Sequence, residues 1–295
     1  MRQVPKPLLG GSAAADPARR WALPWDGLLL GSGHNSAVPP MDFAHVSAAS
    51  AAAFLAGAIN SVAGGGTLVS FPTLLWLGVP SIPANATSTV AIWPGSLGSI
   101  WGFRRELAQA DPRMRTLAIA CLAGGGAGAL LLRITPASLF DRLVPFLILF
   151  ATILFTVQAP IQARLRERTS RPASTEIWMP GAAALLFLAA VYGGYFGAGA
   201  SIVMLSVLSI LGMTDILKMN ALTSFYALCY NAVAALIFIS AGMVYWSYVL
   251  PMAIAAAVGG YGAAGVAQRI GRTAVRRFVM AVGFTISIVM LVRTF

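Results

Sequence analysis

Two short glycine-rich runs contain the residues of this sequence best suited to binding chemistry. Gly64, Gly65 and Gly66 precede Thr67, and Gly197 and Gly199 precede Ser201. Glycine tolerates the backbone angles at which one helix ends and the next begins. A helix that begins inside a membrane exposes free N–H groups and a partial positive charge, which attract anions. We therefore expect two helix starts, with Thr67 and Ser201 as added hydroxyl donors, to face one central anion site.

Each run is followed, after a short apolar stretch, by an asparagine. Asn85 and Asn220 lie where the N-caps of the third and eighth apolar segments are expected. Two alternatives stay open at this level. The asparagines either line a path or only cap helices, and the glycines either bind a ligand or only allow close helix packing.

The reactive side chains that an enzyme needs are scarce. The sequence has two histidines, His34 and His45, and its two cysteines, Cys121 and Cys229, each lie inside an apolar block. All nine acidic residues fall in the N-terminal tail, in loops or at segment ends, whereas proton relays place carboxylates within the membrane. We expect no catalytic residue, no metal site and no cofactor.

The composition is that of a membrane protein. Of the 295 residues, 58% are hydrophobic and 10% are charged, against roughly 25% charged in soluble domains. The net charge of +11 is explained by basic cytoplasmic loops, which set membrane orientation. We therefore expect a lipid bilayer and no nucleic acid as partner.

Ten apolar segments provide the helices that position these residues. Segments two and seven are too short to cross about 30 Å of hydrocarbon as helices, so they are either re-entrant or have their ends below the surface. If all ten segments cross, thirteen basic residues fall on one side and three on the other, which the positive-inside rule favours. The segments are 43–62, 67–79, 86–103, 116–132, 143–160, 177–196, 200–213, 221–245, 247–267 and 278–292.

The second half of the chain repeats the first. Gly65 matches Gly199 and Gly78 matches Gly212, and the run Asn85–Thr89 matches Asn220–Ser224 with one residue inserted. Gly124-Gly125 likewise matches Gly259-Gly260. Five segments is an odd number, so the second half must be inverted in the membrane. Loop charge agrees, because arginines cluster in 103–115 but are absent from its counterpart 242–246.

These patterns predict four regions. Residues 41–160 form the first repeat, 161–176 a basic cytoplasmic linker and 177–295 the second repeat. Residues 1–40 are expected either to be a disordered tail or to precede a true start at Met41. The predicted fold class is an all-α polytopic membrane protein with short or broken helices after the glycine-rich runs.

The first-half motif resembles a known family. The segments Ala58–Thr67, Phe71–Leu75, Gly78–Pro80 and Ala84–Ser88 look like the signature of the sulfite exporter TauE/SafE family. The second half is more degenerate, with Ser206 where Pro72 has its match. The resemblance implies a transporter of small sulfur-containing anions. Together with the repeat it gives a substrate-binding set of Asn60, Gly64, Gly65, Gly66, Thr67, Asn85, Thr87, Ser88, Gly197, Gly199, Ser201, Asn220 and Thr223.

We therefore expect a secondary transporter of a small anion, multi-pass in a bacterial inner membrane, with a homo-oligomer left open. An anion-selective channel and a non-transporting scaffold are the alternatives, because a pore uses the same groups as a carrier.

Overall fold

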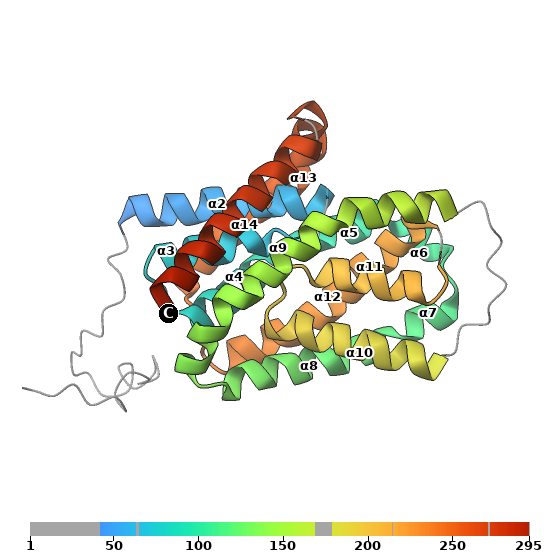
Figure 1. Cartoon of the computed structure of the whole chain (residues 1–295), viewed down its shortest axis with the longest axis horizontal. Helices are drawn as coiled ribbons and strands as arrows, with labels where there is room; N and C mark the ends of the chain where they lie inside the picture. Colours follow the sequence, from blue (N-terminus) through green and yellow to red (C-terminus); the bar gives the residue numbers. More distant parts are fainter. Residues whose placement is uncertain (1–41, 63–64, 169–178, 214, 271, 295) are drawn as a thin grey trace, which may run out of the picture. The chain divides into compact units, whose positions relative to one another are not determined.

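The chain folds as a bundle of α-helices. A computed structural model describes residues 42–62, 65–168, 179–213, 215–270 and 272–294, all within one compact unit, 38–295. The predictions for 1–40 lie outside these residues. No strand occurs in the described ranges (Figure 1). The helices are α2 (Phe43–Val62), α3 (Thr67–Trp76), α4 (Ser81–Ile92), α5 (Gly95–Gly102), α6 (Arg104–Ala108), α7 (Pro112–Thr116), α8 (Ala118–Ile134), α9 (Ala137–Arg168), α10 (Met179–Tyr195), α11 (Ala200–Ile210), α12 (Ile216–Ser240), α13 (Trp246–Ile270) and α14 (Arg272–Thr294).

The helices have the length and composition of membrane spans. Within the described chain, four of them contain stretches long and apolar enough to cross a bilayer: Phe43–Asn60, Pro112–Ile134, Ala137–Val157 and Ile216–Ser240. Large apolar side chains such as Leu188, Leu236 and Ile254 are exposed on the bundle, as expected of a surface that contacts lipid. The fold class is thus an all-α polytopic membrane protein, as predicted.

The structure corrects several predicted boundaries. The single segment 86–103 is two helices, α4 and α5, because Pro94 has no N–H to continue the helix. The eighth segment begins at Ile216 rather than at 221. α3 and α11 are shorter than predicted, at 10 and 11 residues, and each rises only about 15–17 Å. Each helix is thus shorter than the roughly 30 Å hydrocarbon core, so a crossing at these positions must include the flanking residues or have its ends below the membrane surface.

The glycines that the repeat matches have matching conformations. Gly65 and Gly199, before α3 and α11, have φ angles of 96° and 75°, and Gly78 and Gly212, after them, both have φ of 84°. Side chains disfavour this left-handed region, which explains the choice of glycine. The N–H groups of Gly78 and Gly212 bond to the Leu75 and Ser209 carbonyls, each at 3.0 Å. The two short helices therefore begin and end in the same way.

Helix packing is reciprocal between the halves. α2 packs along α13, and its counterpart α10 packs along α8, which is the counterpart of α13. α3 contacts α14 as α11 contacts α9, and α12 contacts both α4 and α5. This exchange of partners is what a two-fold pseudosymmetry requires.

Glycine allows the closest of these contacts. A Cβ atom at Gly259 on α13 would collide with the Phe54 carbonyl of α2, and one at Gly124 on α8 would collide with the Phe187 carbonyl of α10. Gly57 similarly faces the Ala256 carbonyl. The matched positions Gly124 and Gly259 thus perform the same packing task in both helix pairs.

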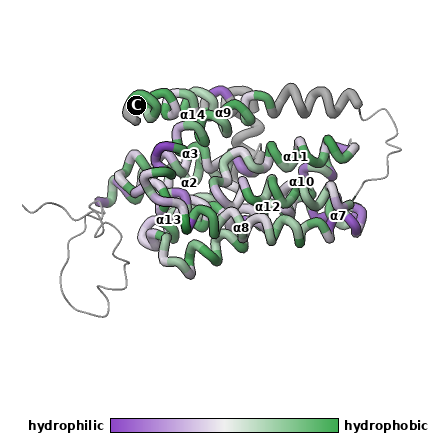
Figure 2. The backbone as a smooth tube through the Cα atoms, turned by 60° about the horizontal axis from the view of Figure 1, so that its bottom comes forward, coloured by the Kyte–Doolittle hydropathy of each residue, from purple (hydrophilic) through white to green (hydrophobic). Residues whose placement is uncertain are grey.

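The arginine-rich loop lies at one end of the bundle. α6 and α7, which contain Arg104, Arg105, Arg113 and Arg115, are at that end, and the turn from α8 to α9 and the C-terminus are at the other (Figure 1). Figure 2 shows hydrophilic residues gathered at α7, with apolar residues along α8, α10, α11 and α12. The polar ends and apolar middle fit a bundle whose long helices run through the bilayer.

Candidate functional site

One pocket lies where both halves meet. Its volume is about 80 Å³, which gives room for several water molecules. Five of the predicted binding residues line it: Asn60, Gly65, Thr67, Gly197 and Ser201. The remaining lining residues come from α4, α5, the turn between them, and α12. They are Thr89, Ile92, Trp93, Ser96, Ser99, Ser224, Ala227, Tyr230 and Asn231.

The starts of both short helices face this pocket. The N–H groups of Leu68 and Ile202 bond to the carbonyls of Gly65 and Gly199 at 3.0 and 2.9 Å. The N–H groups of Thr67 and Ser201 have no acceptor within the described chain. Thr67 and Ser201 therefore each offer the pocket a backbone N–H and a hydroxyl.

Asn60 fixes the connection that brings α3 to the pocket. Its Oδ1 atom accepts a hydrogen bond from the Gly66 N–H at 2.7 Å. A capping side chain accepts a hydrogen bond from a backbone N–H at the start of a helix. Asn60 does this for the start of α3, although Asn60 itself belongs to the preceding helix, α2. Gly66 itself packs against α2, because a Cβ atom there would collide with the Ala56 carbonyl.

The lining is built from equivalent positions of the two halves. Thr67 pairs with Ser201, and the register that matches Asn85 to Asn220 also pairs Thr89 with Ser224. The same register pairs Ile92 with Ala227 and Ser96 with Asn231. All eight residues line the pocket. The pocket lining thus combines matched positions from both halves of the chain.

The pocket is polar but uncharged. None of the described residues that line it is acidic or basic. Hydroxyl and amide groups and two helix N-termini are donors suited to an anion. Because no fixed cation is present, an anion bound here is not held by a full ion pair and can leave again.

Other predicted residues lie outside the lining and connect the halves instead. The Asn85 side chain is 1% exposed, and its Nδ2 atom donates to the Tyr195 carbonyl of α10 at 3.0 Å. Thr87 Oγ1 accepts from the Tyr245 N–H at 3.0 Å. Trp93, which does line the pocket, adds a third such bond, because its Nε1 atom donates to the Leu228 carbonyl at 3.2 Å. These bonds hold α4 and its C-terminal turn against the second half.

The remaining predicted residues have separate surroundings. Ser88 shares a 2.7 Å hydrogen bond with Ser70 inside the first half, whereas the hydroxyl of its counterpart Thr223 is buried without a partner in the described chain. Asn220 is half-buried. Gly199 sets the backbone before α11 without lining the pocket, and Gly64 lies outside the described residues.

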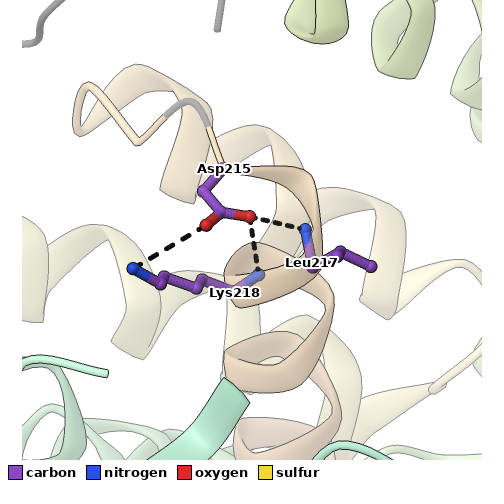
Figure 3. Close-up of polar contacts among 3 residues, drawn as sticks. All are labelled: Asp215, Leu217 and Lys218. Carbon is purple, nitrogen blue, oxygen red and sulfur yellow. Dashed lines mark hydrogen bonds and ion pairs between the residues drawn. The ribbon is translucent and has the colours of Figure 1, made fainter. Parts of the chain in front are cut away.

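The predicted capping role of both asparagines is wrong. Pro80 is the N-cap of α4, and Asp215 is the N-cap of α12. Asp215 Oδ1 accepts from the N–H groups of Leu217 and Lys218 at 3.0 and 3.2 Å (Figure 3). Its other oxygen lies 3.8 Å from Lys218 Nζ. A proline and an acidic residue start these helices earlier than the asparagines would.

Sequence reasoning missed the polar residues that follow each asparagine. Thr89, Ser96 and Ser99 follow Asn85 at helical spacing, and Ser224 and Asn231 follow Asn220 in the same way. Residues spaced by three, four or seven share a helix face. The spacing of these polar residues therefore indicated one polar helix face after each asparagine, and that face lines the pocket.

This architecture defines a polytopic α-helical membrane protein with one uncharged polar site inside it. The family described as sulfite exporter TauE/SafE matches residues 49–290, and the chain belongs to that family. Membrane transport of a small solute is accordingly its functional class.

Curated relatives agree with this class. A probable membrane transporter protein of Sinorhizobium is 28% identical over 79% of this chain and 82% of its own length. One from Haemophilus influenzae is 27% identical over 78% of this chain and 88% of its own. The probable membrane transporter protein YfcA of Escherichia coli K12 is 27% identical, over 66% and 70%. No solved structure matches the chain.

Proposed function

We propose that this protein is a secondary transporter that moves a small sulfur-containing anion, such as sulfite or a sulfonate, across a bacterial inner membrane. The observation that supports it most is the uncharged pocket between the starts of α3 and α11. Two helix N-termini and several hydroxyl groups there can replace the water around an anion. The family's description, sulfite exporter, supports this substrate class.

The repeat supports a carrier rather than a fixed pore. Regions 41–160 and 177–295 are the two repeats, and 161–176 is the linker between them. Reciprocal helix packing and the asymmetric loop charges both support inversion of one repeat in the membrane. Inverted repeats with a site at their interface are typical of secondary transporters, in which one repeat moves against the other.

A flux assay in reconstituted vesicles tests the proposal. Purified protein is placed in liposomes loaded with sulfite, and exchange is measured against external sulfite, thiosulfate, methanesulfonate and acetate. We expect saturable exchange of sulfite or methanesulfonate that exceeds acetate exchange. Failure to move any sulfur anion refutes the substrate class, and unitary currents in planar bilayers in place of saturable exchange refute the carrier.

A further inference from the structure

Tyr230 is one of the pocket residues without an equivalent in the other half. The alignment of the two halves that matches Ser96 to Asn231 also matches Gly95 to Tyr230. Tyr230 lines the pocket and is 2% exposed, whereas Gly95 has no side chain to contribute. The two halves thus differ at this position by a whole aromatic ring.

Two glycines pack closely against Tyr230, one against its ring and one against its backbone. A Cβ atom at Gly193 on α10 would lie 2.7 Å from the ring, and one at Gly125 on α8 would lie 2.6 Å from the Tyr230 Cα atom. α12 therefore contacts α8 and α10 as closely as the backbone allows. Because the ring is packed against α10, it cannot withdraw from the pocket in that direction without displacing the helix.

The Tyr230 hydroxyl also lies among the binding groups. It interacts with the side chains of Ser201 and Asn231, which both line the pocket. The ring thus lies against the start of α11, and its matched position in the first half, Gly95, supplies no ring; the other aromatic residue of the lining, Trp93, lies at a different position of the repeat. A ligand that contacts Thr67 and Ser201 must fit beside this ring.

We propose that Tyr230 sets the upper size limit of the transported anion. This inference rests on the proposed function, since it concerns the same pocket. With the ring present among the lining residues, we expect the site to accept a sulfite-sized group and to exclude an extended alkyl chain. Each methylene that must be forced into a filled pocket costs about tenfold or more in discrimination.

A series of alkanesulfonates of increasing chain length measures this limit. In the liposome assay, the wild-type protein should exchange sulfite and methanesulfonate and should lose rate steeply by propanesulfonate. Tyr230→Ala should raise the ratio of propanesulfonate to sulfite exchange at least about tenfold. Tyr230→Leu should shift the limit less, and Tyr230→Trp should lower it.

Matched variants separate ring size from general damage. Tyr226 lies one turn earlier on α12, is fully buried and donates to the Met114 carbonyl at 2.6 Å, but does not line the pocket. Tyr226→Ala should leave the size limit unchanged. Tyr230→Phe should also keep the limit, because it retains the ring and removes only the hydroxyl.

The outcomes distinguish the two proposals. If the wild-type protein exchanges sulfite and the size limit is the same in Tyr230→Ala, Tyr230→Leu and Tyr230→Trp, the inference is wrong and the proposed function stands. If the wild-type protein moves no sulfur anion, the proposed function is wrong and the inference fails with it. Should Tyr230→Ala not give a monodisperse protein, the Leu and Trp variants decide the question, because both fill most of the space.

Discussion

At the scale of single residues, the pocket depends on donors that come in pairs. Thr67 and Ser201 occupy equivalent positions, and each brings to the pocket a hydroxyl and a backbone N–H that has no acceptor among the described residues. A hydrogen bond to a charged group contributes about 1.5–3 kcal/mol. These two hydroxyls are therefore expected to influence anion affinity more than any other single side-chain atoms of the lining.

Removal of either hydroxyl should weaken anion binding. Thr67→Val and Ser201→Ala change little in shape, and each should raise the KM for the transported anion about tenfold or more. The measurement is initial exchange rate against sulfite concentration. Thr73→Val is the matched control, because Thr73 is also on α3 but its hydroxyl donates to the Val69 carbonyl at 2.8 Å and does not line the pocket. An equal effect in this control would contradict the assignment.

Asn85 should be important for stability through its contact with Tyr195. Asn85→Asp is nearly isosteric but places an oxygen against the Tyr195 carbonyl, in a site that is 1% exposed. We expect the free energy of unfolding to fall by at least about 3 kcal/mol, because the new group is either a buried charge or an acid that must stay neutral. The matched control is Asn220→Asp, since Asn220 is the counterpart of Asn85 and is half-buried. Unfolding in detergent measures both, and equal losses would contradict the role given to the Asn85–Tyr195 bond.

The sequence predicted five of the residues that line the pocket, but not the contacts that the other predicted residues make. Glycine before Thr67 and Ser201 indicated both helix starts of the pocket, because a helix break in an apolar chain usually requires glycine or proline. Asn85 was found for the wrong reason, since its partner, Tyr195, is remote in the sequence. Thr89 and Ser224 were missed because a hydroxyl in an apolar helix can equally well bond to its own backbone. Only packing shows which hydroxyls face a shared space.

At the scale of helices, glycine determines which pairs can pack closely. Gly124 and Gly259 were matched from the sequence, but their partners were not predictable, because the contacts join α8 to α10 and α13 to α2.

The division of α4 from α5 was missed as well. Pro94 was visible, but prolines also occur within membrane helices. In this structure Trp93 and Pro94 separate two helices, and both helices contribute to the pocket.

Bulky residues at these glycines should prevent assembly of the bundle. Gly259→Val and Gly124→Val each place a side chain against a backbone carbonyl, which cannot move as a flexible side chain can. We expect loss of the monodisperse peak in detergent size-exclusion chromatography and loss of transport. Gly102→Val is the matched control, because nothing lies within 4 Å of a Cβ atom there and the protein should remain folded. Normal folding of both Gly124 and Gly259 variants would refute the close packing.

At the scale of the whole molecule, the pocket and the repeat depend on each other. Matched positions of the two halves line one pocket, and the helix contacts are reciprocal between the halves, both of which a two-fold pseudosymmetry predicts. Sequence matching predicted two halves of five segments each. It could not predict that the starts of α3 and α11 line one shared pocket, because that depends on which helices pack beside each start.

The membrane sides of three loops test inversion directly. In a background with Cys121→Ala and Cys229→Ala, single cysteines replace Gln109, Ser138 or Ser240, which are all exposed. Because arginines near Gln109 mark the cytoplasmic side, a membrane-impermeant thiol reagent should label Ser138→Cys and Ser240→Cys in spheroplasts, and Gln109→Cys only in inverted vesicles. Gln109 and Ser240 lie at or next to equivalent loops of the two repeats, 103–115 and 242–246. Their labelling from opposite sides is therefore the signature of inversion, and labelling from the same side would mean that the repeats are parallel and that loop charge does not follow membrane side in this protein.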